Sequence, residues 1–110
     1  MTKQIELYKT KRGKIPFLQW LNRLKDKMIK IKIKRRLDRL SLGDFGDYKL
    51  ITKELCELRI HVGPGYRIYF ACYKQDIVVL LIGGDKKSQK RDVKKAGKYW
   101  VDFKERVNED

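Results

Sequence analysis

The chain has 110 residues, of which 42% are hydrophobic, so it can form one hydrophobic core and is too short for a second domain. Its formal net charge of +14 at pH 7 opposes compaction and is typical of proteins whose partner is an anion such as nucleic acid. The sequence contains no apolar run near the ~20 residues of a membrane-spanning helix, and its first residues lack an apolar signal region, so we expect a cytoplasmic protein without a membrane partner.

The first third of the chain predicts one strand and two helices. Residues 2–9 alternate between polar and apolar side chains, which indicates a strand at an edge of a sheet. Pro16 suits the first turn of a helix, and the apolar stripe after it consists of Phe17, Trp20, Leu21, Leu24 and Met28. Residues 25–42 predict a second amphipathic helix, with Gly43 placed to end it. Two such helices in succession predict a helical hairpin that covers one face of the sheet.

The second helix also carries the most basic run of the chain. Its polar faces include Lys30, Lys34 and Arg35. A solvated helix face and a surface that binds nucleic acid both explain such a run. With a net charge of +14 both interpretations stand, and the second makes these three side chains candidate RNA-binding residues.

The middle of the chain predicts a sheet. Residues 48–52 indicate a short strand, and longer runs of aromatic and aliphatic residues follow at 55–62, 66–73 and 76–82. Short breaker segments separate these runs, as in a three-stranded antiparallel meander. The last run has no polar interruption, so we expect it to be central and buried on both faces. Cys56 and Cys72 match neither a disulfide scaffold nor a zinc motif, and we interpret them as reduced core thiols.

The side-chain alternation of the meander separates a core face from an open face. A period of two places Cys56, Leu58, Ile60 and Val62 in the core and leaves Arg59 and His61 on the opposite side, with Arg67 of the next strand beside them. The last strand ends at Gly83 and Gly84, where exposed backbone can approach a ligand closely, and Lys86 and Lys87 follow directly. We therefore expect five side chains to converge at this end of the sheet: Arg59, His61, Arg67, Lys86 and Lys87.

The last segment, residues 88–107, predicts an amphipathic helix that docks on the sheet. Its apolar positions are Val93, Ala96, Trp100, Phe103 and Val107. We interpret the two aromatic residues among them as packing anchors, with base stacking as the alternative. Further candidate RNA-binding residues lie on the exposed side of this helix: Lys90, Arg91 and Lys94.

A cluster of fixed cations can hold the phosphates of a nucleic acid and stabilise the additional charge on a phosphate attacked in line. This chemistry suits RNA cleavage without a metal or cofactor, in which a 2′-hydroxyl attacks the adjacent phosphate. His61 is the only histidine, which excludes a multi-histidine metal site. It is also the only side chain that titrates unperturbed near neutral pH, so it is either the general base or a structural or phosphate-binding residue.

The element order, together with the segments at 57–61, 63–70 and 81–89, resembles the RelE/ParE superfamily of toxins, and most closely the phage Gp49-like, HigB-type addiction module killer proteins. The resemblance covers nearly the whole chain. It implies an α+β domain over residues 1–110 with a RelE-like fold: an antiparallel twisted sheet of four to five strands, an N-terminal helical hairpin and a C-terminal helix.

The resemblance also implies roles for individual residues. Arg67 would stabilise the transition state, Lys86 or Lys87 would protonate the leaving oxygen or bind phosphate, and Arg59 would position the RNA or assist the base. The chain departs from the family pattern near its C-terminus, where RelE has a tyrosine and some HigB proteins a histidine. The corresponding segment is Arg91-Asp92-Val93-Lys94, which leaves Asp92 or His61 as the base.

The function implied by this resemblance is that of a type II toxin, a ribosome-dependent mRNA endoribonuclease held inactive by a cognate antitoxin of helix-turn-helix type. Its expected partners are the antitoxin, mRNA and the ribosome, with operator DNA contacted only through the antitoxin. Two alternatives remain: a ParE-like inhibitor that binds DNA gyrase without hydrolysis, and a non-catalytic RNA-binding module. Retention of the basic cluster favours the nuclease.

Overall fold

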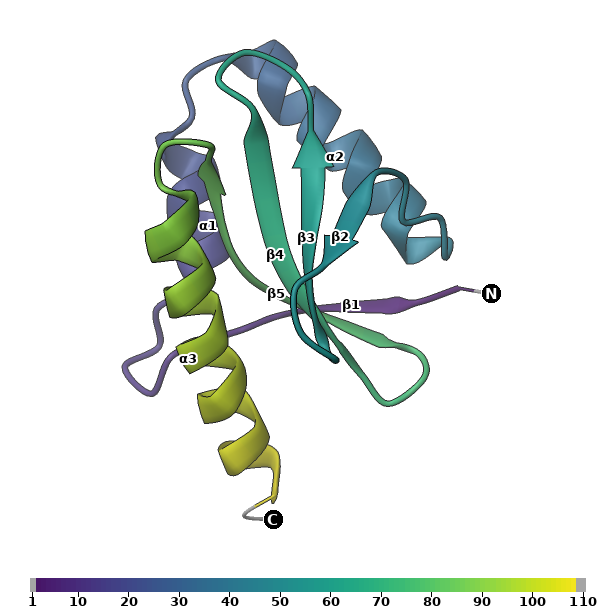
Figure 1. Cartoon of the computed structure of the whole chain (residues 1–110), viewed down its shortest axis with the longest axis vertical. Coiled ribbons are helices and arrows are strands. Elements are labelled where there is room, and N and C mark those ends of the chain that lie inside the picture. Colours follow the sequence, from purple (N-terminus) through teal and green to yellow (C-terminus); the bar gives the residue numbers. More distant parts are fainter. Residues whose placement is uncertain (1, 109–110) are drawn as a thin grey trace.

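A mixed β-sheet forms the centre of the protein, with helices on both of its faces (Figure 1). The computed structural model describes residues 2–108. Within this range the chain forms five strands and three helices in the order β1 (Gln4–Leu7), α1 (Pro16–Arg23), α2 (Lys27–Ser41), β2 (Tyr48–Leu50), β3 (Leu55–Ile60), β4 (Tyr66–Tyr73), β5 (Ile77–Asp85) and α3 (Gln89–Asn108). The predicted α+β class and the C-terminal helix are confirmed.

The strand order in the sheet is β1-β5-β4-β3-β2. Strands β2 to β5 form the predicted antiparallel meander, but β1 pairs with β5 in parallel, with Ile5 opposite Val78. The prediction of an entirely antiparallel sheet is therefore wrong at this edge. Alternation along residues 2–9 identifies a strand but carries no information about its direction. The long connection through two helices lets the chain enter the sheet in either direction.

The sheet is covered on both faces. Helices α1 and α2 bury Phe17, Trp20 and Ile33 against the face that carries Leu58 and Ile68. Helix α3 buries Ala96 and Trp100 against the opposite face, which confirms the packing interpretation of Trp100. The face predicted to be open is therefore covered by α3, while the end near the β3–β4 turn carries an accessible cleft. The thiols of Cys56 and Cys72 are free.

The two N-terminal helices do not form the predicted hairpin. Asp26 begins α2 by accepting a hydrogen bond from the Met28 backbone N–H at 2.8 Å, so the chain turns after α1. Met28 therefore belongs to α2 and is 60% exposed, not part of the α1 stripe. The helices diverge from their connection and pack separately onto the sheet (Figure 1). None of the helices within residues 2–108 is both long and apolar enough to cross a membrane.

The glycine pair at the end of β5 is buried, which corrects the expectation of exposed backbone that approaches a ligand. A Cβ at Gly83 would lie 2.1 Å from Cε3 of Trp20, and a Cβ at Gly84 would lie 1.9 Å from an Asp92 carboxylate oxygen. Because neither glycine has a side chain, α1 can pack closely against one face of β5 and α3 against the other. Their function is close packing of helices on the sheet.

We expect Gly83→Ala to destabilise the fold by about 1–3 kcal/mol, because the tryptophan ring must move in a packed core. Gly97→Ala is the matched control, since nothing lies within 4 Å of the added methyl group and alanine favours a helix. Urea unfolding of both variants measures the free energy of unfolding. Equal stabilities of the two variants would contradict the packing role of Gly83.

Candidate functional site

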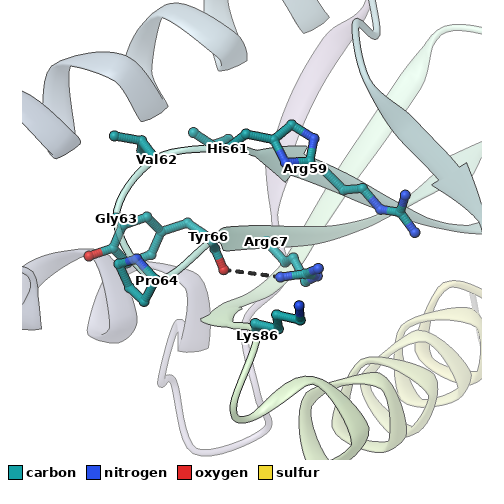
Figure 2. Close-up of a pocket in the computed structure, with 10 residues that line it drawn as sticks. Arg59, His61, Val62, Gly63, Pro64, Tyr66, Arg67 and Lys86 are labelled. Atoms are coloured by element: carbon teal, nitrogen blue, oxygen red, sulfur yellow. Dashed lines mark hydrogen bonds between the residues drawn. The ribbon is translucent and has the colours of Figure 1, made fainter.

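The turn end of the β3–β4 hairpin lines a cleft of about 410 Å³. Four of its lining residues have guanidinium, ammonium or imidazole side chains: Arg59, His61, Arg67 and Lys86. Ile60 and residues 62–66 form the rest of the lining, and the turn residues are visible in Figure 2. The structure thus brings together four of the five side chains that the sequence predicted to converge at this end.

Arg59 and Arg67 are neighbours because β3 and β4 pair in antiparallel register with these residues directly opposite each other. Two like charges in that position repel each other. The compensating charge is Glu57, two residues before Arg59 on the same face and only 1% exposed. Its Oε1 accepts a hydrogen bond from Arg59 Nε at 3.1 Å, and its Oε2 lies 3.7 Å from Arg67 Nε. A single buried carboxylate therefore anchors both guanidinium groups.

Two further donors complete the environment of Glu57. The Tyr69 hydroxyl donates to Oε2 at 3.1 Å, and Gln89 Nε2 of helix α3 donates to the same oxygen at 2.9 Å. Burial opposes ionisation of Glu57, but the hydrogen bonds from Gln89, Arg59 and Tyr69 and the charge of Arg67 outweigh it and hold its pKa below the usual range. Burial and the neighbouring carboxylate raise the pKa of Tyr69, which therefore remains a neutral donor.

Arg67 is the least exposed of the basic side chains that line the cleft. Its side chain is 12% exposed, and its Nη1 donates to the Gly65 carbonyl oxygen at 3.1 Å (Figure 2). A Cβ at Gly65 would lie 3.4 Å from Arg67 Nη1 and 3.9 Å from Lys86 Cβ, so both basic residues flank this turn residue. Arg67 is thus preorganised, whereas Lys86 is exposed and can adjust to a ligand.

His61 lies at the rim of the cleft and is 71% exposed. Its Nε2 is hydrogen-bonded to the Asp47 carboxylate, which leaves Nδ1 as the other ring nitrogen. This hydrogen bond from His61 lowers the pKa of Asp47. Arg36 of α2 holds the loop before β2 in place, because its Nη2 donates to the carbonyl oxygens of Phe45 and Asp47, each at 3.1 Å. The imidazole therefore has an orienting carboxylate on a supported loop.

Lys87 does not share this cleft with Lys86. It lines a second cleft, of about 480 Å³, at the junction of β5 and α3. Asp92, the alternative base, also lines the second cleft, where it is 4% exposed and accepts a hydrogen bond from the Ser88 hydroxyl. The turn between Asp85 and Ser88 therefore places each of the two consecutive lysines in a different cleft.

The six candidate RNA-binding residues divide between the two faces of the sheet. Those of α2 are Lys30, Lys34 and Arg35, and those of α3 are Lys90, Arg91 and Lys94. Because α2 and α3 cover opposite faces, the two groups do not form one surface. Arg91 alone among the six lines one of the two clefts.

Sequence reasoning missed the residues that organise the site, above all Glu57, Tyr69 and Gln89. The available signal was the alternation itself, which places Glu57 on the same face as Arg59 and opposite Tyr69. The alternation alone does not show that α3 buries this face of the sheet and with it the Glu57 carboxylate. Within residues 2–108, no group of three or more His, Cys, Asp and Glu side chains is arranged to hold a metal ion.

Two comparisons with known proteins bear on this site. Residues 19–98 match the family described as Phage derived protein Gp49-like (DUF891). An uncharacterized protein of Haemophilus influenzae is 44% identical over 82 residues, which span 74% of this chain and 83% of the relative. The family match includes every residue of the two clefts described above.

Proposed function

Because the chain belongs to the Gp49-like family of phage-derived proteins, a toxin-like family, we propose that it is the toxin of a type II toxin–antitoxin pair and cleaves mRNA on the ribosome. The resemblance of its segments at 57–61, 63–70 and 81–89 to RelE/ParE toxins of the HigB type supports the same activity. The net charge of +14 suits a polyanionic substrate.

One observation carries the proposal: two arginines on paired strands are anchored by one buried carboxylate and face a cleft that also contains a lysine and a histidine. Fixed guanidinium groups are suited to a phosphate, because their donors match its oxygen atoms and need no reorganisation during the reaction. A purely structural ion pair would not require a second arginine, a lysine and an open cleft beside it.

The proposed reaction is a transesterification within the RNA. The 2′-oxygen attacks the adjacent phosphorus, the bond from phosphorus to the 5′-oxygen of the next nucleotide breaks, and the products carry a 2′,3′-cyclic phosphate and a 5′-hydroxyl. Arg67 and Arg59 stabilise the charge that develops on the phosphate oxygens. His61, oriented by Asp47, accepts the 2′-hydroxyl proton at Nδ1, and Lys86 supplies a proton to the leaving 5′-oxygen.

The proposed partners follow from the same surface. An antitoxin of helix-turn-helix type, encoded beside this protein, binds over the basic cleft and blocks access of RNA. Contact with operator DNA occurs through that antitoxin. An acidic segment is the expected complement to the cleft, because three lining positions are cationic: Arg59, Arg67 and Lys86.

Induction of the protein in bacteria, followed by primer extension on abundant mRNAs, tests the proposal. We expect cuts in phase with the codons of translated messages, absent when translation initiation is blocked and absent when the antitoxin is co-expressed. Lys98→Ala, which removes an exposed lysine outside both clefts, should cut as the wild type does. Intact mRNA together with DNA breaks would instead support inhibition of gyrase, and intact mRNA with growth unaffected would support a non-catalytic binding module.

A further inference from the structure

The second cleft, at the junction of β5 and α3, is a separate basic surface to which the proposed reaction assigns no role. Its volume is about 480 Å³. Three parts of the chain contribute basic side chains: Arg23 at the end of α1, Lys87 in the turn after β5, and Arg91 and Lys95 on α3. All four of these residues are exposed.

The positive charge of this cleft is largely free to bind a ligand. Asp85 and Asp92 are the two carboxylates in the lining, and both are engaged with Ser88. Asp85 Oδ1 accepts from the Ser88 backbone N–H at 3.1 Å, and Asp92 accepts from the Ser88 hydroxyl. Arg91 Nε lies 4.0 Å from Asp92 Oδ1. None of the ion pairs within residues 2–108 includes Arg23, Lys87 or Lys95.

The two clefts adjoin each other through the paired ends of β4 and β5. Arg67 and Tyr66 line the first cleft, and their register partners Gly84 and Asp85 line the second. Paired strands lie about 4.8 Å apart, so the two clefts are separated by little more than one strand. The consecutive residues Lys86 and Lys87 line one cleft each, and therefore connect them along the surface.

We propose that the second cleft is a backbone subsite for the same RNA, holding phosphates of nucleotides that flank the scissile one. Proteins usually bind single-stranded nucleic acid in a positively charged groove that follows the nucleic-acid backbone from one phosphate to the next. The inference rests on the proposed function, because that function places the scissile phosphate in the first cleft. Binding of a single-stranded RNA across both clefts can be measured separately from cleavage.

The subsite contacts the backbone and does not read the bases. Trp20, the aromatic side chain in the lining, is 7% exposed and packs over Gly83, so its ring face is not available for stacking. Phosphate contacts fix the position and orientation of a nucleic acid without selecting its sequence. The subsite should therefore contribute similar affinity to RNAs of different sequence.

Binding of oligoribonucleotides to the full-length protein tests the inference. The probes are fluorescein-labelled RNAs of three and nine nucleotides, fully 2′-O-methylated so that they cannot be cleaved, with anisotropy measured at several salt concentrations. The test variant is Arg91→Ala/Lys95→Ala, and the matched control is Lys32→Ala/Lys98→Ala, which removes two exposed positive charges outside both clefts. Circular dichroism melting verifies that both variants are folded.

We expect the test variant to bind the nine-nucleotide RNA about tenfold or more weakly than the wild type and the trinucleotide within twofold. The slope of log K against log salt should decrease in magnitude by about 1.4 for loss of two phosphate contacts to single-stranded RNA.

Equal losses of RNA affinity in the test and control variants, or equal losses for both RNA lengths, would overturn the subsite. Absence of cleavage in cells with this length dependence retained would reject the nuclease and leave the subsite as part of an RNA-binding surface. Loss of antitoxin binding alone, with RNA binding unchanged, would assign the cleft to the protein partner and overturn the inference.

Discussion

Arg67→Ala is expected to reduce cleavage of ribosome-bound mRNA by about 100- to 1,000-fold, the typical loss when one preorganised donor to a developing negative charge is removed. The reason is geometric as well as electrostatic. The guanidinium is held by the Gly65 carbonyl oxygen and the charge of Glu57, so it is already in position when charge develops on the phosphate. Single-turnover cleavage, with detection of the 2′,3′-cyclic phosphate product, measures the effect.

Two further variants distinguish the hydrogen bonds of the Arg67 guanidinium from its charge and from the net charge of the protein. Arg67→Lys retains the positive charge but cannot donate two parallel hydrogen bonds to a phosphate, so we expect only partial activity. Arg12→Ala removes an exposed arginine outside both clefts and should retain full activity. A rate for Arg67→Ala within threefold of the wild type, in a protein that melts normally, would remove Arg67 from the proposed mechanism.

The second large effect concerns Glu57. Glu57→Gln should destabilise the fold by about 3 kcal/mol at pH 7, at the lower end of the range for breaking a buried ion pair. The carboxylate receives donors on both oxygens, so an amide in its place directs its own N–H groups at another donor whichever way it turns. Activity should decrease as well, because both arginines lose the charge that positions them. Urea unfolding at pH 7 gives the change in the free energy of unfolding.

The destabilisation should depend on pH. Because the pKa of Glu57 is lower in the folded protein than in the unfolded chain, its ionisation stabilises the fold above the unfolded value of about 4.3. That contribution is lost as the pH falls through the folded pKa. The difference in stability between the wild type and Glu57→Gln should therefore be full at pH 7 and become small well below pH 4.

Glu54→Gln is the matched control for this pH dependence. Glu54 forms an ion pair with Lys104 at 3.1 Å, but the two side chains are 44% and 39% exposed. An exposed pair contributes about 0–1 kcal/mol, so this substitution should have little effect at any pH. A loss of stability in Glu57→Gln no larger than in Glu54→Gln would show that the buried carboxylate does not anchor the arginines.

Local patterns predicted much of the fold because they depend on residues close together in the chain. The runs at 55–62, 66–73 and 76–82 all became strands of an antiparallel meander. Pro16 begins α1, and the stripe at residues 93–103 packs α3 against the sheet. The predictions were wrong where the position of one element depends on another. The spacing of apolar residues placed Met28 on the buried stripe of the first helix, but Asp26 caps a new helix in which Met28 faces solvent.

The sequence by itself determined which side chains share a face of each strand, and hence that Arg59 and Arg67 lie together at one end of the sheet, because alternation is a property of an extended backbone. The tertiary structure decided the remaining features. Helix α3 buries Glu57 and brings Gln89 to it across 32 positions in the chain. Trp20 of α1 fills the space beside Gly83, and Asp92 of α3 fills the space beside Gly84. The turn between β5 and α3 places Lys86 and Lys87 in different clefts. Such contacts depend on how whole elements pack, and no periodicity within one element records them.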